Sequence, residues 1–249
     1  MLYHCLASSS AGTCHYIALE RIDRRPVVLL LEAGLRYGDM LARMTADKLK
    51  LTDVDAVLIT HNHADHSAAA ADLQRRGVRV YGNRLIVGDD QDKLLEAGRI
   101  KTIAADTYVY PFAVEHDAEN SLGFVLYTNK EMILFVNDCK YFGENLSEQK
   151  FDYIFIEANY DGQAIHFAYE QAKKDGDLAM IKRYERLMDS HMSIRHTCDH
   201  LKQLDLSRCK GIFLMHLSDR NANPNLFKQR VREQFEKPCF VCRKSGGIL

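Results

Sequence analysis

The sequence lacks the features that mark several classes of protein. Acidic and basic residues balance, with 33 Lys and Arg against 34 Asp and Glu and a formal net charge of −1. This balance excludes a globally basic nucleic-acid binder, although a local basic groove remains compatible with it. The longest apolar run, Val27 to Leu31, is far shorter than the ~20 residues of a membrane span. The first twenty residues carry no secretory leader pattern, and we expect a cytoplasmic protein.

Proline, linkers and glycine-rich loops are also scarce. Only four Pro occur in 249 residues, and no repeat or low-complexity segment divides the chain. We therefore expect a single domain over residues 1–249. No Gly-rich phosphate loop follows an early strand, which disfavours Rossmann and P-loop folds. The odd number of Cys, seven, favours reduced thiols. Cys239 and Cys242 form a lone CxxC, which is a weak zinc signal, and we interpret it as strand packing.

Short apolar runs bounded by polar residues or Gly predict buried strands. These runs are Val27–Leu31, Ala56–Thr60, Val78–Tyr81, Tyr108–Val114, Phe124–Thr128, Met132–Val136, Tyr153–Glu157 and Ile212–His216. Helical patterns fall between them at Leu35–Leu49, Asp65–Gly77, Ile165–Met188 (interrupted near Gly176), His196–Leu204 and Asn225–Phe235. Two packed sheets flanked by helices would bury these strands on both faces, so we predict an α/β fold of that kind.

The eleven His include a dense cluster after one predicted strand. The apolar run that starts at Ala56 leads directly into His61-Asn-His63-Ala-Asp65-His66. Strand alternation places His61 and His63 on one face, while Asp65 and His66 lie at the turn into a helix. Imidazole and carboxylate are the ligands that zinc and related ions use. The four candidate ligands of this turn are too few to complete two metal sites. We therefore expect further ligands at other strand ends, and the candidates are His116, Asp138 and His216.

The cluster at 61–66 resembles the HxHxDH motif of the metallo-β-lactamase superfamily, and the three strand-end residues follow in that superfamily's order. The resemblance implies an αββα four-layer sandwich with two divalent metal ions at one edge between the sheets. Zinc is the usual metal there, and Mn²⁺ or Fe²⁺ are alternatives for ligands without Cys. The implied ligand sets are His61, His63 and His116 for the first ion, and Asp65, His66 and His216 for the second, with Asp138 bridging them.

Further segments resemble the YycJ-like (WalJ-like) branch of this superfamily, a group of nucleases that act on DNA. The segments are Ser8–Ile17, Leu31–Leu35, Glu157-Ala-Asn-Tyr-Asp161, Asp189–Ser193 and His216–Asn221. They imply a DNA exonuclease that cleaves phosphodiester bonds by attack of a metal-bridging hydroxide. In that mechanism Asp65 holds the hydroxide, His191 protonates the leaving oxygen, and Glu157 orients His191.

Substrate contacts are expected near these segments and from a basic cluster just before His191. The candidates are Ser193, Ser218, Asn221, Lys182 and Arg183. Two alternatives remain open. The first is a hydrolase of a thioester, a lactone or a small phosphodiester, which a narrow cleft without basic walls would favour. The second is a non-catalytic nucleic-acid-binding descendant, against which the intact set of ligand candidates argues.

Overall fold

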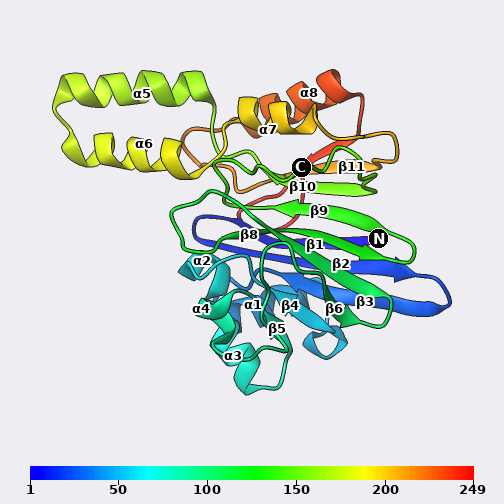
Figure 1. Cartoon of the computed structure of the whole chain (residues 1–249). Coiled ribbons are helices and arrows are strands. Elements are labelled where there is room, and N and C mark those ends of the chain that lie inside the picture. The colour runs from blue at the N-terminus through cyan, green and yellow to red at the C-terminus, as the bar shows by residue number, and fades with distance from the viewer.

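The computed structural model describes all 249 residues as two sheets packed face to face, with helices on both outer sides (Figure 1). The first sheet has five strands in the order β1-β2-β3-β4-β5. Its first three strands are antiparallel, and the pairs β3–β4 and β4–β5 are parallel. The strands are β1 (Leu2–Ser9), β2 (Gly12–Arg21), β3 (Arg24–Leu31), β4 (Ala56–Leu58) and β5 (Val80–Tyr81).

The second sheet has seven strands in the order β12-β11-β10-β9-β8-β7-β6. Strands β9 to β12 are mutually parallel, whereas β6 to β9 form an antiparallel meander. Parallel pairing gathers the carboxyl ends of β9, β10 and β11 at one edge. The strands are β6 (Lys101–Ala104), β7 (Thr107–Ala113), β8 (Leu122–Thr128), β9 (Met132–Val136), β10 (Tyr153–Glu157), β11 (Gly211–Met215) and β12 (Cys239–Val241).

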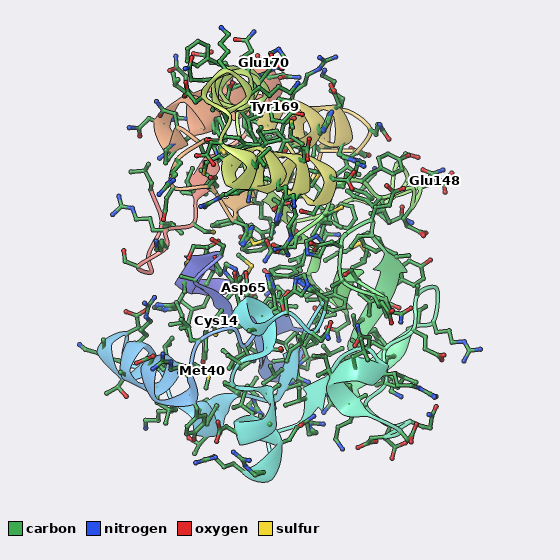
Figure 2. The ribbon with its side chains drawn as sticks, turned by 90° about the vertical axis from the view of Figure 1, so that its left-hand side faces the viewer. Cys14, Met40, Asp65, Glu148, Tyr169 and Glu170 are labelled. Carbon is green, nitrogen blue, oxygen red and sulfur yellow. The ribbon has the colours of Figure 1, made fainter.

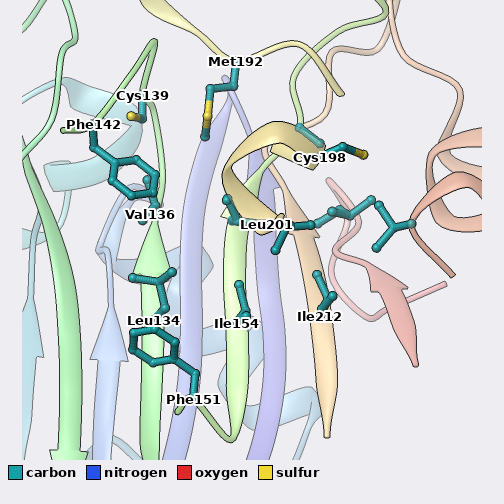
Figure 3. Close-up of a cluster of buried hydrophobic side chains, with 14 of the residues drawn as sticks. Leu134, Val136, Cys139, Phe142, Phe151, Ile154, Met192, Cys198, Leu201 and Ile212 are labelled. Atoms are coloured by element: carbon teal, nitrogen blue, oxygen red, sulfur yellow. The ribbon is translucent and has the colours of Figure 1, made fainter. Parts of the chain in front are cut away.

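Helices cover the outer face of each sheet, which makes the four-layer arrangement predicted from the sequence. On the first sheet lie α1 (Tyr37–Ala46), a 3₁₀ turn (Leu51–Asp53), α2 (Ala64–Ser67), α3 (Ala70–Arg75) and α4 (Arg84–Val87). On the second lie α7 (Ile194–Leu201) and α8 (Pro224–Phe235). Figure 3 shows part of this outer core, in which Leu134, Ile154 and Ile212 on the sheet face Leu201 of α7.

A helical hairpin, α5 (Gly162–Asp175) and α6 (Leu178–Ser190), projects from the second sheet beside the other helices (Figure 1). The interruption predicted near Gly176 is confirmed. Gly176 adopts the left-handed conformation at φ +68° and ends α5, and the Asp177 side chain then accepts a hydrogen bond from the Met180 backbone N–H to begin α6. No helix of the structure is both long and apolar enough to cross a membrane.

The single helix predicted over Asp65–Gly77 is wrong, because the chain forms two short helices there, α2 and α3. The β3 loop interrupts the helical hydrogen bonds. Ala33 N donates to His66 O at 2.8 Å, and Ala69 N donates to Ala33 O at 2.9 Å. These backbone groups therefore bind the neighbouring chain instead of closing a helical turn. The break separates the site-bearing helix α2 from the rest of the segment.

Candidate metal centre

The seven predicted metal ligands meet at one edge of the sandwich. His61 and His63 follow β4, Asp65 and His66 belong to α2, and His116 follows β7. Asp138 follows β9 and His216 follows β11. Figure 2 places Asp65 between the lower helices and the α5–α6 hairpin above them. Strand ends and one short helix therefore deliver side chains from four separate segments of the chain to a common point.

The side chains gather in two groups that match the two ligand sets expected from the sequence. His61, His63 and His116 offer nitrogen atoms that lie within 4.8 Å of one another. Asp65, His66, Asp138 and His216 form a second group within the same limit. Asp138 Oδ2 lies 3.1 Å from His66 Nε2 and 3.8 Å from His116 Nε2. Asp138 thus reaches both groups, as a bridging carboxylate must.

Hydrogen bonds on the outer side of the first group fix the orientation of its imidazoles. Thr60 Oγ1 donates to Glu32 Oε1 at 2.6 Å, so its lone pairs are left to accept from His61 Nδ1 at 2.9 Å. His116 Nδ1 lies 2.8 Å from the Ser190 carbonyl oxygen and donates to it. Both rings therefore direct the lone pair of Nε2 inward, which is the arrangement typical of metal-bound His.

Several inward-facing atoms are buried and have no hydrogen-bond partner in the protein. They include His61 Nε2, His66 Nε2, His216 Nε2 and Asp138 Oδ1. Unpaired buried polar atoms are costly, and their convergence is explained by cations bound between them. Burial also lowers the pKa of His61 and His116, helped by neighbouring imidazoles, so both offer neutral nitrogen lone pairs. The donor set therefore fits divalent metal ions.

Three residues of this centre have strained backbones. Glu32, Asp138 and His216 have φ values of 67°, 46° and 53°, in the left-handed region that residues other than Gly rarely adopt. Local contacts hold His216 there, since its backbone N donates to Ser8 Oγ at 2.9 Å and Asn159 Nδ2 donates to its carbonyl oxygen at 2.8 Å. Such strain is concentrated at sites where side-chain direction matters more than stability.

His191 lies beside the second group and is held by Glu157. His191 Nδ1 is 2.7 Å from Glu157 Oε1, and Glu157 Oε2 accepts the backbone N–H groups of Cys139 at 2.9 Å and Met192 at 3.1 Å. Burial lowers the pKa of His191, but the Glu157 carboxylate outweighs that effect, and the net pKa is raised. Because Nδ1 is engaged by Glu157, Nε2 remains available on the side of the cleft.

An open cleft of about 820 Å³ lies over the cluster, and polar and charged residues make up most of its wall. Lys182, Arg183 and Arg186 of α6 line it, and so does Arg220. Arg186 pairs with Asp117 at 2.6 Å, whereas Lys182, Arg183 and Arg220 have no carboxylate partner. Three uncompensated cations thus face the His and Asp side chains.

Three of the five predicted substrate contacts line the cleft, and two do not. Lys182, Arg183 and Ser218 line the cleft. Ser193 is buried and caps α7, where its hydroxyl accepts from His196 N at 3.2 Å. Asn221 is also buried, and its Nδ2 donates to Ser218 Oγ at 3.3 Å. These two residues therefore shape the loops that carry the cleft instead of lining it.

Sequence reasoning missed the residues that position the ligands. Glu32 lay inside a recognised segment, but its contact with Thr60 depends on β3 and β4 being neighbours in the sheet. The positioning role of Gly34 could not be recognised from the sequence either. A Cβ atom there would lie 1.6 Å from the Asp65 carbonyl oxygen, so only Gly allows the β3 loop to approach α2.

Gly34→Ala is expected to displace the backbone of Asp65 and His66 and to remove at least about half of the bound metal, since a shift of ~1 Å at a site is enough to disrupt it. Metal analysis of the purified variant measures this directly. Gly38→Ala is the matched control, because a Cβ at Gly38 meets nothing within 4 Å. Equal metal content in the two variants would refute the positioning role of Gly34.

A His and Asp cluster at one edge of an αββα sandwich defines the protein as a hydrolase of the metallo-β-lactamase fold, a fold that implies divalent-metal binding. The family model of the beta-lactamase superfamily domain matches residues 29–216, well over half of the chain, and the chain belongs to that superfamily. The resemblance and the fold class predicted from the sequence are thereby confirmed.

The chain is also similar to individual known proteins. It is 27% identical over 235 residues to exodeoxyribonuclease WalJ of Streptococcus pneumoniae, which covers 88% of this chain and 82% of that protein. It is 25% identical over 256 residues to exodeoxyribonuclease YycJ of Bacillus anthracis, covering 96% and 90%. Among solved structures it resembles the metallo-β-lactamase fold protein YhfI of Bacillus subtilis, with a TM-score of 0.70, 14% identity and coverage of 99% and 97%.

Proposed function

We propose that this protein is a metal-dependent phosphodiesterase that degrades nucleic acid, with DNA ends as its substrate. The observation that carries the proposal is the pairing of the His and Asp cluster with the unpaired cations Lys182, Arg183 and Arg220 in one open cleft. A polyanionic backbone needs positive charge along its path. The names of the WalJ and YycJ relatives, both exodeoxyribonucleases, support the same substrate.

Two zinc ions are the proposed cofactors, one held by His61, His63 and His116 and one by Asp65, His66 and His216, with Asp138 between them. When bound, such ions supply Lewis acidity toward a phosphate oxygen and lower the pKa of a water ligand. Mn²⁺ or Fe²⁺ can replace zinc at a site that contains no thiolate. Metal analysis of the protein purified without added metal distinguishes these ions.

The residues around the ions have separate tasks in this proposal. Asp65 and Asp138 orient the attacking water by accepting its hydrogen bonds. His191 Nε2 gives a proton to the leaving oxygen, while Glu157 fixes the ring through the 2.7 Å contact to Nδ1. Lys182, Arg183 and Ser218 bind the phosphates next to the scissile bond. The cleft is open and charged, so a small apolar thioester or lactone would leave most of its wall without contacts.

The double variant Lys182→Ala/Arg183→Ala is expected to weaken DNA binding roughly tenfold and to lower the salt dependence of binding by about 2 in the log–log slope, because each lost phosphate contact removes about one counterion. Fluorescence anisotropy with labelled DNA across a salt series gives both quantities. Lys173→Ala/Lys174→Ala, on the neighbouring helix α5 and outside the cleft, is the charge-matched control. An unchanged slope in the α6 variant would contradict the proposed path of the DNA.

A further inference from the structure

A second group of metal-ligating side chains lies in the core between the sheets and shares no member with the candidate metal centre. Cys5 of β1, His15 of β2 and Cys242 directly after β12 offer ligand atoms that all lie within 4.8 Å of one another. The three residues are 2%, 0% and 2% exposed. Positions 5, 15 and 242 are thus brought from both ends of the chain into one closed space.

Tyr3 lies beside this group. Its Oη lies 2.8 Å from His15 Nδ1 and 3.0 Å from Cys242 Sγ. His15 Nε2 is buried and has no hydrogen-bond partner. Four polar side chains therefore converge, and one strong ligand atom among them is unsatisfied.

The surroundings are apolar. Tyr3 packs against Phe155 and Phe213, with ring centroids 4.8 Å and 4.9 Å away, and His15 packs against Phe135 at 5.7 Å. An imidazole nitrogen without a hydrogen-bond partner in such a core is costly.

We propose that Cys5, His15 and Cys242 bind one zinc ion through two sulfur atoms and His15 Nε2, while the Tyr3 hydroxyl holds the other ring nitrogen, Nδ1. In a tetrahedral site with Zn–S and Zn–N distances of about 2.3 and 2.0 Å, the ligand atoms lie about 3.5 Å from one another. The three side chains already lie within 4.8 Å of one another, so small side-chain movements are enough to bring them to an ion. Two Zn–S bonds and one Zn–N bond form, and the protons of both thiols leave to solvent. Two thiolates and Zn²⁺ sum to zero charge, which suits an apolar core, whereas Cu⁺ would leave a net negative charge.

The position of the site indicates what the ion would stabilise. The segment after β12 lies against β1, because Ser8 N donates to Arg243 O at 3.1 Å and Gly247 N donates to Cys5 O at 2.8 Å. Ser8 in turn accepts from the backbone of His216. An ion between Cys5 and Cys242 would join β1 of one sheet to β12 of the other. Cys239 packs in a different core cluster, so the CxxC does not supply two ligands to one site.

The test is a titration of the reduced, metal-stripped full chain with Co²⁺. Thiolate ligands give an intense near-ultraviolet sulfur-to-cobalt band, and the candidate metal centre, which has no Cys in its ligand groups, does not. Because the candidate metal centre also takes up Co²⁺, we expect the band to level off only after all sites are filled, at the intensity of about one thiolate-bound Co²⁺ per chain, and to fall to background in Cys5→Ser and Cys242→Ser. X-ray absorption of the zinc-loaded native chain should show sulfur scatterers, and this readout does not depend on the folding of any variant.

Cys14→Ala is the control, because Cys14 precedes His15 on β2 but packs in the core on the other face of the sheet. This variant should keep the band. Absence of the band in the native chain would overturn the proposal, and so would a Cys5–Cys242 disulfide found in the protein isolated with its thiols trapped. None of these readouts involves DNA or hydrolysis, so they leave the proposed nuclease function untouched.

Discussion

Asp65→Ala is expected to reduce hydrolysis by on the order of 10⁴-fold, because an activated water and charge compensation at phosphorus both depend on an intact metal pair. Asp65 Oδ2 lies 3.6 Å from His66 Nε2 and 3.8 Å from His216 Nε2, at the centre of the second ligand group. Metal analysis should show a loss of about one ion per chain. Turnover is measured in metal-defined buffer with end-labelled DNA.

The fold should survive this change. Asp65 is partly exposed on α2 and makes no capping hydrogen bond there, so its removal leaves no buried group unpaired apart from the metal ligands. Asp72→Ala, an exposed carboxylate on α3 that pairs with Arg75, serves as the control and should keep full activity. Retained turnover in Asp65→Ala, with metal controlled, would defeat the proposed mechanism.

His191→Ala is expected to slow cleavage by about 10²–10⁴-fold, the usual contribution of a general acid, while bound metal stays unchanged. The defect should depend on the leaving group. A nucleoside 5′-phosphate ester of p-nitrophenol departs without protonation, so the variant should approach the native rate on that substrate. Steady-state rates on DNA and on the ester, with metal content beside them, make the comparison.

Glu157→Gln should show a smaller defect of the same kind, since His191 would lose the partner that fixes Nδ1. His196→Ala, on the exposed side of α7, is the matched control and should be neutral. A loss of metal in His191→Ala would show that His191 is a ligand. An equal defect on DNA and on the ester would show that it does not act as an acid.

The residues of the candidate metal centre could be predicted because they occur in patterns that the sequence alone displays. His61, His63 and His66 lie in one six-residue segment, and Asp138 and His216 each follow an apolar run that forms a strand almost as expected. The break at Gly176 was predictable for a similar reason, since Asp-Gly-Asp ends one helix and begins the next.

The supporting structure was not predictable, because it depends on contacts between distant segments. The helix expected from Asp65 is divided by hydrogen bonds to Ala33, which only the pairing of β3 with β4 brings near. The same pairing makes Glu32 and Gly34 part of the site. Cys5 and Cys242 are separated by nearly the whole chain, and nothing local to either indicates the other. Ser193 was predicted from a motif to contact the substrate, but its side chain instead caps α7.

The most direct test of the central proposal is a time course of the metal-replete native chain with 5′- and 3′-labelled single- and double-stranded DNA and RNA, analysed by product length. The account predicts progressive shortening of linear DNA from an end, dependent on added divalent metal and abolished in Asp65→Ala. A chain that binds its metal ions yet leaves every DNA and RNA substrate intact would contradict it.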